Sequence, residues 1–183
     1  MNIFQPIVIL ISAVVFVFLQ SASPGLLRWF GTPVNLLPAL MVCTSLRCGM
    51  GMVVTVAVVA GLSFDSLSMN PLGVSVAPLF CVGLLINLRR ELILQDQPFA
   101  QLVLGLAASA LVPLATVLLL LSLGRPLLLN LGSCWQWLVM SAGGMLATPV
   151  LFAGFGWLNR ALGYQPVVET SFRADREIRR GRN

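Results

Sequence analysis

The feature that most constrains this chain is an apolar stretch from Phe99 to Leu123 that contains no charged residue. A helix needs about 20 predominantly apolar residues to cross the hydrocarbon core of a bilayer, and this stretch exceeds that length. The rest of the chain is similar, since 58% of its 183 residues are hydrophobic and only 9% are charged. So much apolar surface cannot be hidden inside one water-soluble core. We therefore expect an all-α, polytopic membrane protein.

Other apolar segments set the number of expected helices. Three of them predict one helix each: Ile3 to Leu19, Val74 to Leu88, and a last segment that follows Trp135 and Trp137 at the membrane interface and ends near Leu162. Together with Phe99 to Leu123 they make four. The remaining segment, Val34 to Phe64, decides the total.

The segment Val34 to Phe64 is too long for one upright helix and barely long enough for two. Two helices would break between Arg47 and Gly51, where two glycines favour a turn and the arginine can extend to the interface. One tilted helix would place Arg47 near the bilayer centre, at a cost of about 2.5–3.5 kcal/mol. We favour two, which makes six transmembrane helices, with five as the alternative. The helices form a membrane domain, residues 1–163, followed by a basic tail, residues 164–183.

The arginines predict the orientation in the membrane. The chain has 11 basic residues, all of them arginine, and a net charge of +5. With six helices, nine fall on one side: Arg47, Arg89, Arg90, Arg160 and the five arginines of the tail. Only Arg28 and Arg125 fall on the other. Arginine favours short cytoplasmic segments, so both termini are expected inside and Asp65 outside. Nucleic acid is not expected as a partner, because the arginines form no stripe interleaved with aromatic residues; anionic membrane lipids suit them better.

The usual catalytic residues are missing from the sequence. There is no histidine, and the four cysteines contain no CxxC pair, so we expect them to pack as small apolar side chains: Cys43, Cys48, Cys81 and Cys134. Asp65 is the one acid that precedes Arg90, so it has no carboxylate partner among the first helices. The expectation is a protein that is not an enzyme, with no catalytic residue, cofactor or metal.

Asp65 stands out because it is a lone carboxylate between apolar segments. It closes the apolar run that starts at Gly49, and turn-forming residues follow it: Ser66, Ser68, Asn70, Pro71 and Gly73. Three roles are open to it. It could cap the following turn by accepting backbone N–H bonds, form an ion pair with Arg28 or Arg125, or bind a partner or ligand.

Two groups of small residues permit helices to approach closely. Gly105 and Ser109 lie one turn apart in the long apolar stretch, and the last predicted helix carries a second group: Gly143, Gly144 and Ala147. In lipid, association between helices depends on such close packing. The two groups could serve a partner's helix or be used by packing within the chain itself.

The stretch from Gly61 to Gly73 resembles a motif of the rod shape-determining protein MreD family of bacterial inner-membrane proteins. The residues that carry the resemblance are Gly61, Leu62, Asp65, Pro71, Leu72 and Gly73, followed by Val74. Pro38, and Thr148-Pro149 with Leu151-Phe152 in the last helix, are similar to further family features. The resemblance extends from Ile7 to Leu162.

The resemblance implies a non-enzymatic scaffold of the rod complex, or elongasome, which directs lateral peptidoglycan synthesis. Members of the family bind MreC, a single-span coiled-coil protein, and work beside RodA and its transpeptidase, RodZ and MreB. The family fold is similar to the six-helix substrate-binding subunits of energy-coupling-factor transporters, so the rival expectation is a small-molecule-binding transport subunit. Those subunits dock their partner through small residues four apart on the first helix. Here Ser12 and Ala13 are followed by Phe16 and Val17, which predicts a helix that faces lipid or a bulkier partner.

Overall fold

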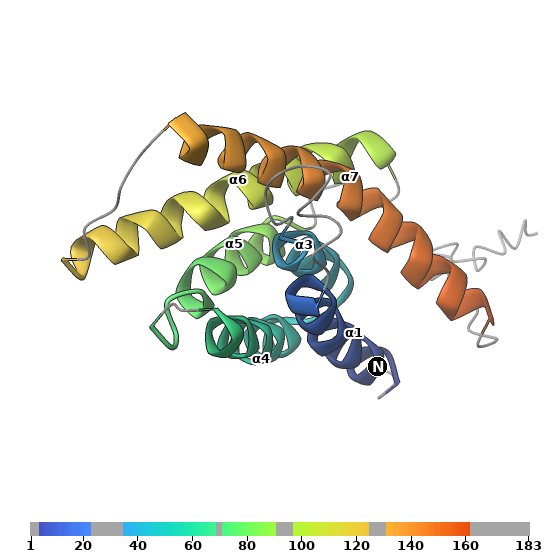
Figure 1. The fold of residues 1–183 in the computed structure, drawn as a ribbon. Coiled ribbons are helices and arrows are strands. Elements are labelled where there is room, and N and C mark those ends of the chain that lie inside the picture. Colours follow the sequence, from blue (N-terminus) through green and yellow to red (C-terminus); the bar gives the residue numbers. More distant parts are fainter. Residues whose placement is uncertain (1–3, 23–34, 69–70, 91–96, 125–130, 162–183) are drawn as a thin grey trace, which may run out of the picture.

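A computed structural model describes residues 4–22, 35–68, 71–90, 97–124 and 131–161. Within these ranges the chain is helical and contains no strand, which confirms the all-α class (Figure 1). The helices are α1 (Phe4–Ala22), α3 (Leu37–Arg47), α4 (Met50–Leu67), α5 (Val76–Leu88), α6 (Pro98–Ser122) and α7 (Leu131–Ala161). Residues 162–183, which include the predicted tail, lie outside the described residues.

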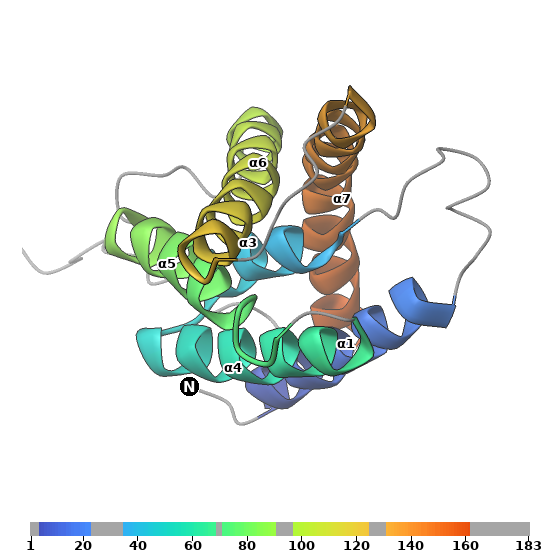
Figure 2. The same ribbon diagram turned by 60° about the vertical axis from the view of Figure 1, so that its left-hand side comes forward.

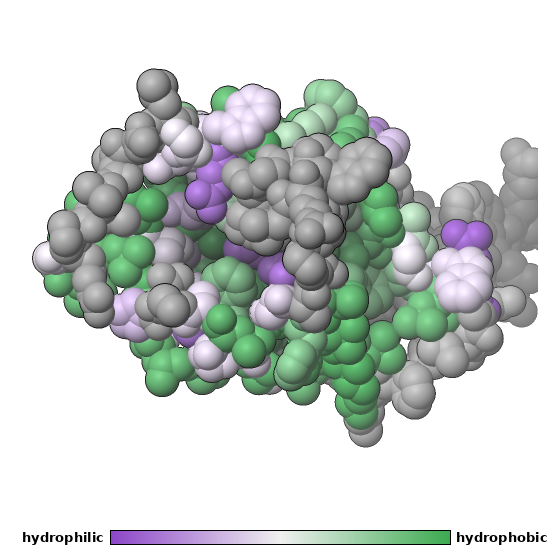
Figure 3. Space-filling view, viewed as in Figure 1, coloured by the Kyte–Doolittle hydropathy of each residue, from purple (hydrophilic) through white to green (hydrophobic). Residues whose placement is uncertain are grey.

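Three helices, α4, α6 and α7, are long and apolar enough to cross a membrane. The others are shorter in their apolar length, and α3 and α5 have only 11 and 13 residues. Large apolar side chains are exposed along the outer faces of the long helices, and much of the described surface in Figure 3 is hydrophobic. Such a surface suits lipid better than water.

The segment Val34 to Phe64 forms two helices, as predicted, and the single tilted helix is wrong. α3 ends at Arg47, and α4 begins at Met50. Cys48 and Gly49 between them are extended, with ψ angles of 164° and 168°. The amide of Cys48 still donates to the carbonyl of Thr44 at 2.8 Å and closes the last turn of α3.

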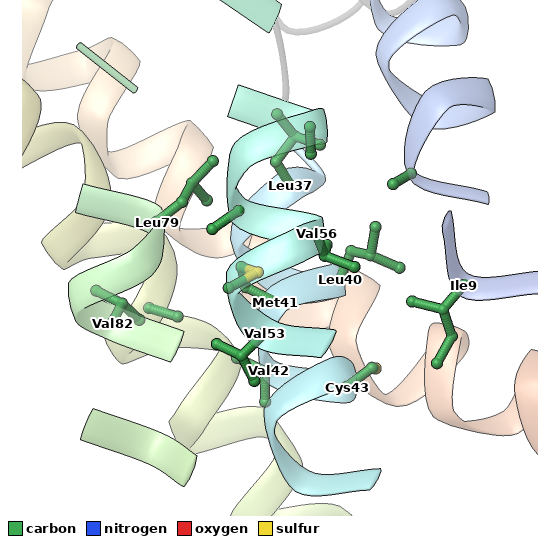
Figure 4. Close-up of a cluster of buried hydrophobic side chains, with 14 of the residues drawn as sticks. Ile9, Leu37, Leu40, Met41, Val42, Cys43, Val53, Val56, Leu79 and Val82 are labelled. Atoms are coloured by element: carbon green, nitrogen blue, oxygen red, sulfur yellow. The ribbon is translucent and has the colours of Figure 1, made fainter. Parts of the chain in front are cut away.

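The helices form three layers, with α1 and α4 on one side, α3 and α5 in the middle, and α6 and α7 on the other side (Figure 1). α3 is the centre of the fold, because it packs against each of the other five described helices. Every residue from Leu37 to Leu46 is buried. A helix that is buried on all sides needs no polar face. Figure 4 shows its side chains among those of the neighbouring helices, with Ile9 of α1, Val56 of α4 and Leu79 of α5 nearby.

Successive helices alternate in direction. α1 and α4 run the same way in Figure 2, and α3 and α5 run the opposite way. α6 and α7 are antiparallel, since Gly105 lies against Thr148 and Ser109 lies against Gly144. The C-terminal ends of α3 and α5 therefore meet at one end of the molecule. The C-terminal ends of α1 and α4 meet at the other.

Two expectations about the outer helices need correction. α1 buries one face, Ile9, Ala13 and Val17, so only its opposite face is open to lipid or a partner. These three positions are four residues apart and form a single stripe on a helix. The last helix starts at Leu131, so Trp135 and Trp137 lie inside it rather than before it. Its end, at Ala161, lies next to the predicted one.

Candidate functional site

Asp65 lies in the last turn of α4, and its side chain is only 1% exposed. One carboxylate oxygen, Oδ2, accepts two backbone hydrogen bonds, from the N–H of Gly73 at 2.8 Å and from the N–H of Ser75 at 3.1 Å. Bonds of this kind to a charged group are among the stronger ones in proteins. Of the roles predicted for Asp65, the structure shows the cap of the following turn. Arg28 and Arg125, the predicted ion-pair partners, lie outside the described residues.

The conformation of the turn that Asp65 caps explains the glycine at position 73. Pro71 accepts a hydrogen bond from the amide of Val74 at 3.3 Å, and Gly73 accepts one from the amide of Val76 at 3.2 Å. Gly73 has a φ of 92°, a backbone conformation that residues with a Cβ rarely adopt. The turn leads directly into α5. Asp65 thus satisfies amides at the entrance of a helix, where no helical partner exists for them.

Gly61 brings the start of α5 close to α4. A Cβ at this position would lie 2.9 Å from the Cα of Val76, so a larger residue would push the two helices apart. The remaining motif residues do not share this role, because Leu62 and Leu72 are exposed and Pro71 is half-buried. The predicted motif therefore divides into residues that build or position the turn, Gly61, Asp65, Pro71 and Gly73, and leucines on the surface.

The position of the turn along α4 makes its hydrogen bonds important. α4 has 18 residues and is long enough to cross a membrane. Val76 lies beside Gly61, about 9 Å from the end of α4 at 1.5 Å per residue, so the turn folds back along the helix. In hydrocarbon, non-helical backbone is tolerated only where protein groups satisfy it. Asp65 supplies that acceptor.

The second carboxylate oxygen of Asp65, Oδ1, is also buried. Among the residues that the structure describes, it has no hydrogen-bond partner. Ser75, whose amide binds the other oxygen, is buried as well. The carboxylate therefore faces the protein interior.

A second polar cluster lies at the opposite end of α5, and the sequence analysis missed it. The side-chain amide of Asn87 donates to the carbonyl of Ser45 at 2.8 Å and to the carbonyl of Cys48 at 3.1 Å. Arg90 adds a longer bond to the same Cys48 carbonyl, at 3.4 Å. These groups cap the C-terminal end of α3, where carbonyls have no helical partner. The available signal was an amide inside an apolar helix, two residues before a pair of arginines.

Arg47 is held by α7 and does not extend freely to the interface. Its Nη2 donates to the backbone carbonyl of Phe152 at 3.2 Å, and the guanidinium lies 4.9 Å from the centre of the Phe152 ring. A cation over an aromatic face is attracted by the ring, most strongly when water is excluded. Arg47 thus joins the end of the central helix to the second half of α7.

The small residues lie between α6 and α7. A Cβ on Gly105 would collide with Thr148, and a Cβ on Gly144 would collide with Ser109. Gly143 and Ala147 are half-buried on α7. Gly105, Ser109 and Gly144 are therefore used for packing within the chain, which was one of the two roles predicted for the small residues.

The cysteines do not all pack in the same way. Cys43 and Cys48 are buried, whereas Cys81 and Cys134 are exposed. The expectation of packing thus fits only the first pair. Within the described ranges, no three His, Cys, Asp or Glu side chains gather as a metal site would require.

The two polar clusters lie at opposite ends of the middle layer. Asp65 caps the start of α5, and Asn87 near the end of α5 caps the end of α3. Each cluster joins two helices through backbone groups, and neither presents a nucleophile with a base. Comparison with protein-family models, curated proteins and solved structures finds no match to this chain.

Proposed function

We propose that this protein is a non-enzymatic scaffold of the bacterial rod complex that resembles the MreD family. In this proposal it lies in the inner membrane with its C-terminus in the cytoplasm, and it binds an MreC-like single-span partner. The observation that carries the proposal is the geometry of Asp65. The residues that build its turn, Gly61, Asp65 and Gly73, belong to the stretch that carries the family resemblance.

The environment of Asp65 supports a structural role over a catalytic one. An acid or base catalyst must come within hydrogen-bond reach of the group that it protonates or deprotonates. Asp65 is 1% exposed, and one of its oxygens already holds two backbone amides. A group placed in this way stabilises the turn between two helices. Scaffolding requires such a fixed arrangement of helices and no chemistry.

The alternating helix directions support six membrane crossings. In Figure 2, α1, α3, α4 and α5 run alternately from one side to the other, so each of these helices ends on the side where the next begins. Arg47 and Arg90 lie at one end of the middle layer, and Asp65 lies at the other. This agrees with the arginine distribution in the sequence, which predicts a cytoplasmic face at the Arg47 end.

The partner has to bind outside the seam between α6 and α7. Gly105, Ser109 and Gly144 are occupied by contacts between these two helices, so they cannot also receive a partner's helix. The surfaces that remain are the outer faces of the helices, where apolar side chains such as Ile11 of α1 and Val58 of α4 are exposed.

The test is co-purification from membranes in a mild detergent. The tagged protein is expressed once with a single-span MreC-like protein and once with the coupling ATPase module of an energy-coupling-factor transporter. We expect stoichiometric recovery of the MreC-like protein only. Recovery of the ATPase module, or of a bound vitamin-like molecule, would overturn the scaffold assignment in favour of a transport subunit.

A further inference from the structure

A small pocket lies where the C-terminal ends of α1 and α4 meet α7. Its volume is about 150 Å³, and it is lined by Gln20, Ser21, Asn35, Phe64, Leu67, Ser68 and Met140. The pocket is at the same end of the molecule as Asp65, but Asp65 does not line it. Its position is separate from both polar clusters described above.

The lining has an apolar part and a polar part. Phe64, Leu67 and Met140 are the apolar lining residues, and Gln20, Ser21, Asn35 and Ser68 are the polar ones. Most of these polar groups already have partners. Asn35 accepts from the amide of Leu37 at 3.0 Å, and the two serines donate to backbone carbonyls.

The side-chain amide of Gln20 differs from its neighbours. Its Nε2 is buried and has no hydrogen-bond partner within the described part of the chain. An unpaired buried donor is destabilising, so a ligand that brings an acceptor oxygen is favoured at this position. The pocket is therefore suited to a neutral carbonyl attached to an apolar chain.

Two tryptophans on α7 indicate the depth of the pocket in a bilayer. Trp135 is 60% exposed and Trp157 is 70% exposed. They are about 33 Å apart along the helix at 1.5 Å per residue, close to the thickness of the hydrocarbon core, and exposed tryptophans favour the two membrane interfaces. Met140 lies about 7.5 Å from Trp135 on the same scale. The pocket is then just inside the interface opposite the Arg47 end, where lipid ester groups meet the acyl chains.

We propose that this pocket binds the ester region of a phospholipid. The ester carbonyl accepts a hydrogen bond from the Gln20 amide, and the first methylenes of the acyl chain lie against Phe64, Leu67 and Met140. About 150 Å³ is the volume of a cavity that holds one benzene molecule, so the pocket has room for an ester with a short length of chain. None of the described residues that line the pocket is charged, so in this proposal the site reads the carbonyl and not the headgroup.

Photo-crosslinking in nanodiscs tests this proposal. The probe is a phosphatidylglycerol with a diazirine on the acyl carbon next to the ester, and labelled positions are mapped by mass spectrometry. We expect labelling at Leu67 and Met140. Met140→Trp fills the pocket and should reduce this labelling at least fivefold, whereas Leu146→Trp, at a 65% exposed position of the same helix, should leave it unchanged.

A second variant and a competitor test the hydrogen bond. Gln20→Leu keeps the shape of the side chain but removes the donor, so labelling should fall by about fivefold, the equivalent of one hydrogen bond. A phosphatidylglycerol with ether-linked chains lacks the carbonyl and should compete about fivefold less well than the ester form. Equal labelling of the parent, Gln20→Leu and Met140→Trp proteins would overturn the proposal. Labelling confined to residues outside the pocket would overturn it too. The outcome does not depend on the scaffold function, since no partner is present.

Discussion

At the scale of single residues, the structure depends on polar side chains that satisfy backbone groups at helix ends. A carboxylate inside an apolar protein is costly unless hydrogen bonds compensate for its lost water. Asp65 obtains two such bonds from one oxygen, and the start of α5 also favours negative charge through the helix dipole. The sequence predicted Asp65 at a helix end, with a cap of the following turn as one of its roles. It did not show which amides are bound, because that depends on how the turn folds back along α4.

The first prediction concerns the loss of this cap. Asp65→Ala removes the acceptor of two amides, of which that of Ser75 is buried, so we expect the free energy of unfolding to fall by about 1.5–3 kcal/mol. Asp65→Asn keeps an oxygen acceptor and should lose less. Unfolding by sodium dodecyl sulfate in mixed micelles, followed by circular dichroism, measures the difference. The control is Ser66→Ala, one residue along on the exposed side of the helix. Equal stability of the Asp65→Ala and Ser66→Ala proteins would show that the cap does not contribute to the free energy of unfolding.

The second prediction concerns Asn87, which caps the end of α3. Asn87→Leu keeps a similar size but leaves the carbonyls of Ser45 and Cys48 without this donor. We expect a loss of about 1–3 kcal/mol in the same unfolding assay, although the change makes the helix more hydrophobic. Leu88→Ala, at the exposed neighbouring position, serves as the control and should change stability little. An Asn87→Leu protein as stable as the parent would mean that hydrophobicity outweighs the cap.

At the scale of helices, the pairing of α6 with α7 depends on where small residues meet. The sequence predicted close packing from Gly105, Ser109, Gly143, Gly144 and Ala147. The register between the two helices was not predictable, because small residues permit an approach without specifying the partner. In the structure the side chain of Ser109 packs against Gly144, and that of Thr148 packs against Gly105. The Trp137 indole adds a hydrogen bond to the carbonyl of Ala110 at 3.0 Å.

The third prediction compares two glycines of α7. Gly144→Ala places a Cβ onto the Ser109 side chain, so the helices must separate, and we expect a loss of about 1–3 kcal/mol from overpacking. Gly154→Ala meets nothing within 4 Å, and alanine is the better helix former by about 1 kcal/mol. This variant should be as stable as the parent or more so. Thermal unfolding of the two purified variants, side by side, checks the prediction. A Gly154→Ala protein less stable than the parent would contradict the prediction, because it would mean that the added methyl group meets a neighbour.

At the scale of the whole molecule, the six helices of the described residues were predictable, and their depth in the fold was not. Glycines after Arg47 ended α3, and turn residues after Asp65 ended α4. The complete burial of α3 could not be foreseen, because its apolar sequence fits a lipid-facing helix as well as a central one. Whether α3 faces lipid or lies at the centre depends on how the other five described helices pack around it. The role of Arg47 was missed for the same reason, since Phe152 is distant in the sequence.

The last prediction concerns the orientation of the molecule in the membrane. Arg47, Asn87 and Arg90 meet at one end, and Arg47 also binds the second half of α7, which carries Arg160 in its last turn. Short arginine-bearing segments favour the cytoplasmic side, so this end and both termini should face the cytoplasm, while the turn after Asp65 faces the periplasm. Alkaline phosphatase is active only in the periplasm, and green fluorescent protein fluoresces only in the cytoplasm after ordinary export. We expect fluorescence from fusions at Met1 and Asn183, and phosphatase activity from an insertion at residues 69–70. A periplasmic N-terminus with a cytoplasmic C-terminus would require an odd number of crossings, so one of the short helices α3 and α5 would have to lie within the membrane without crossing it.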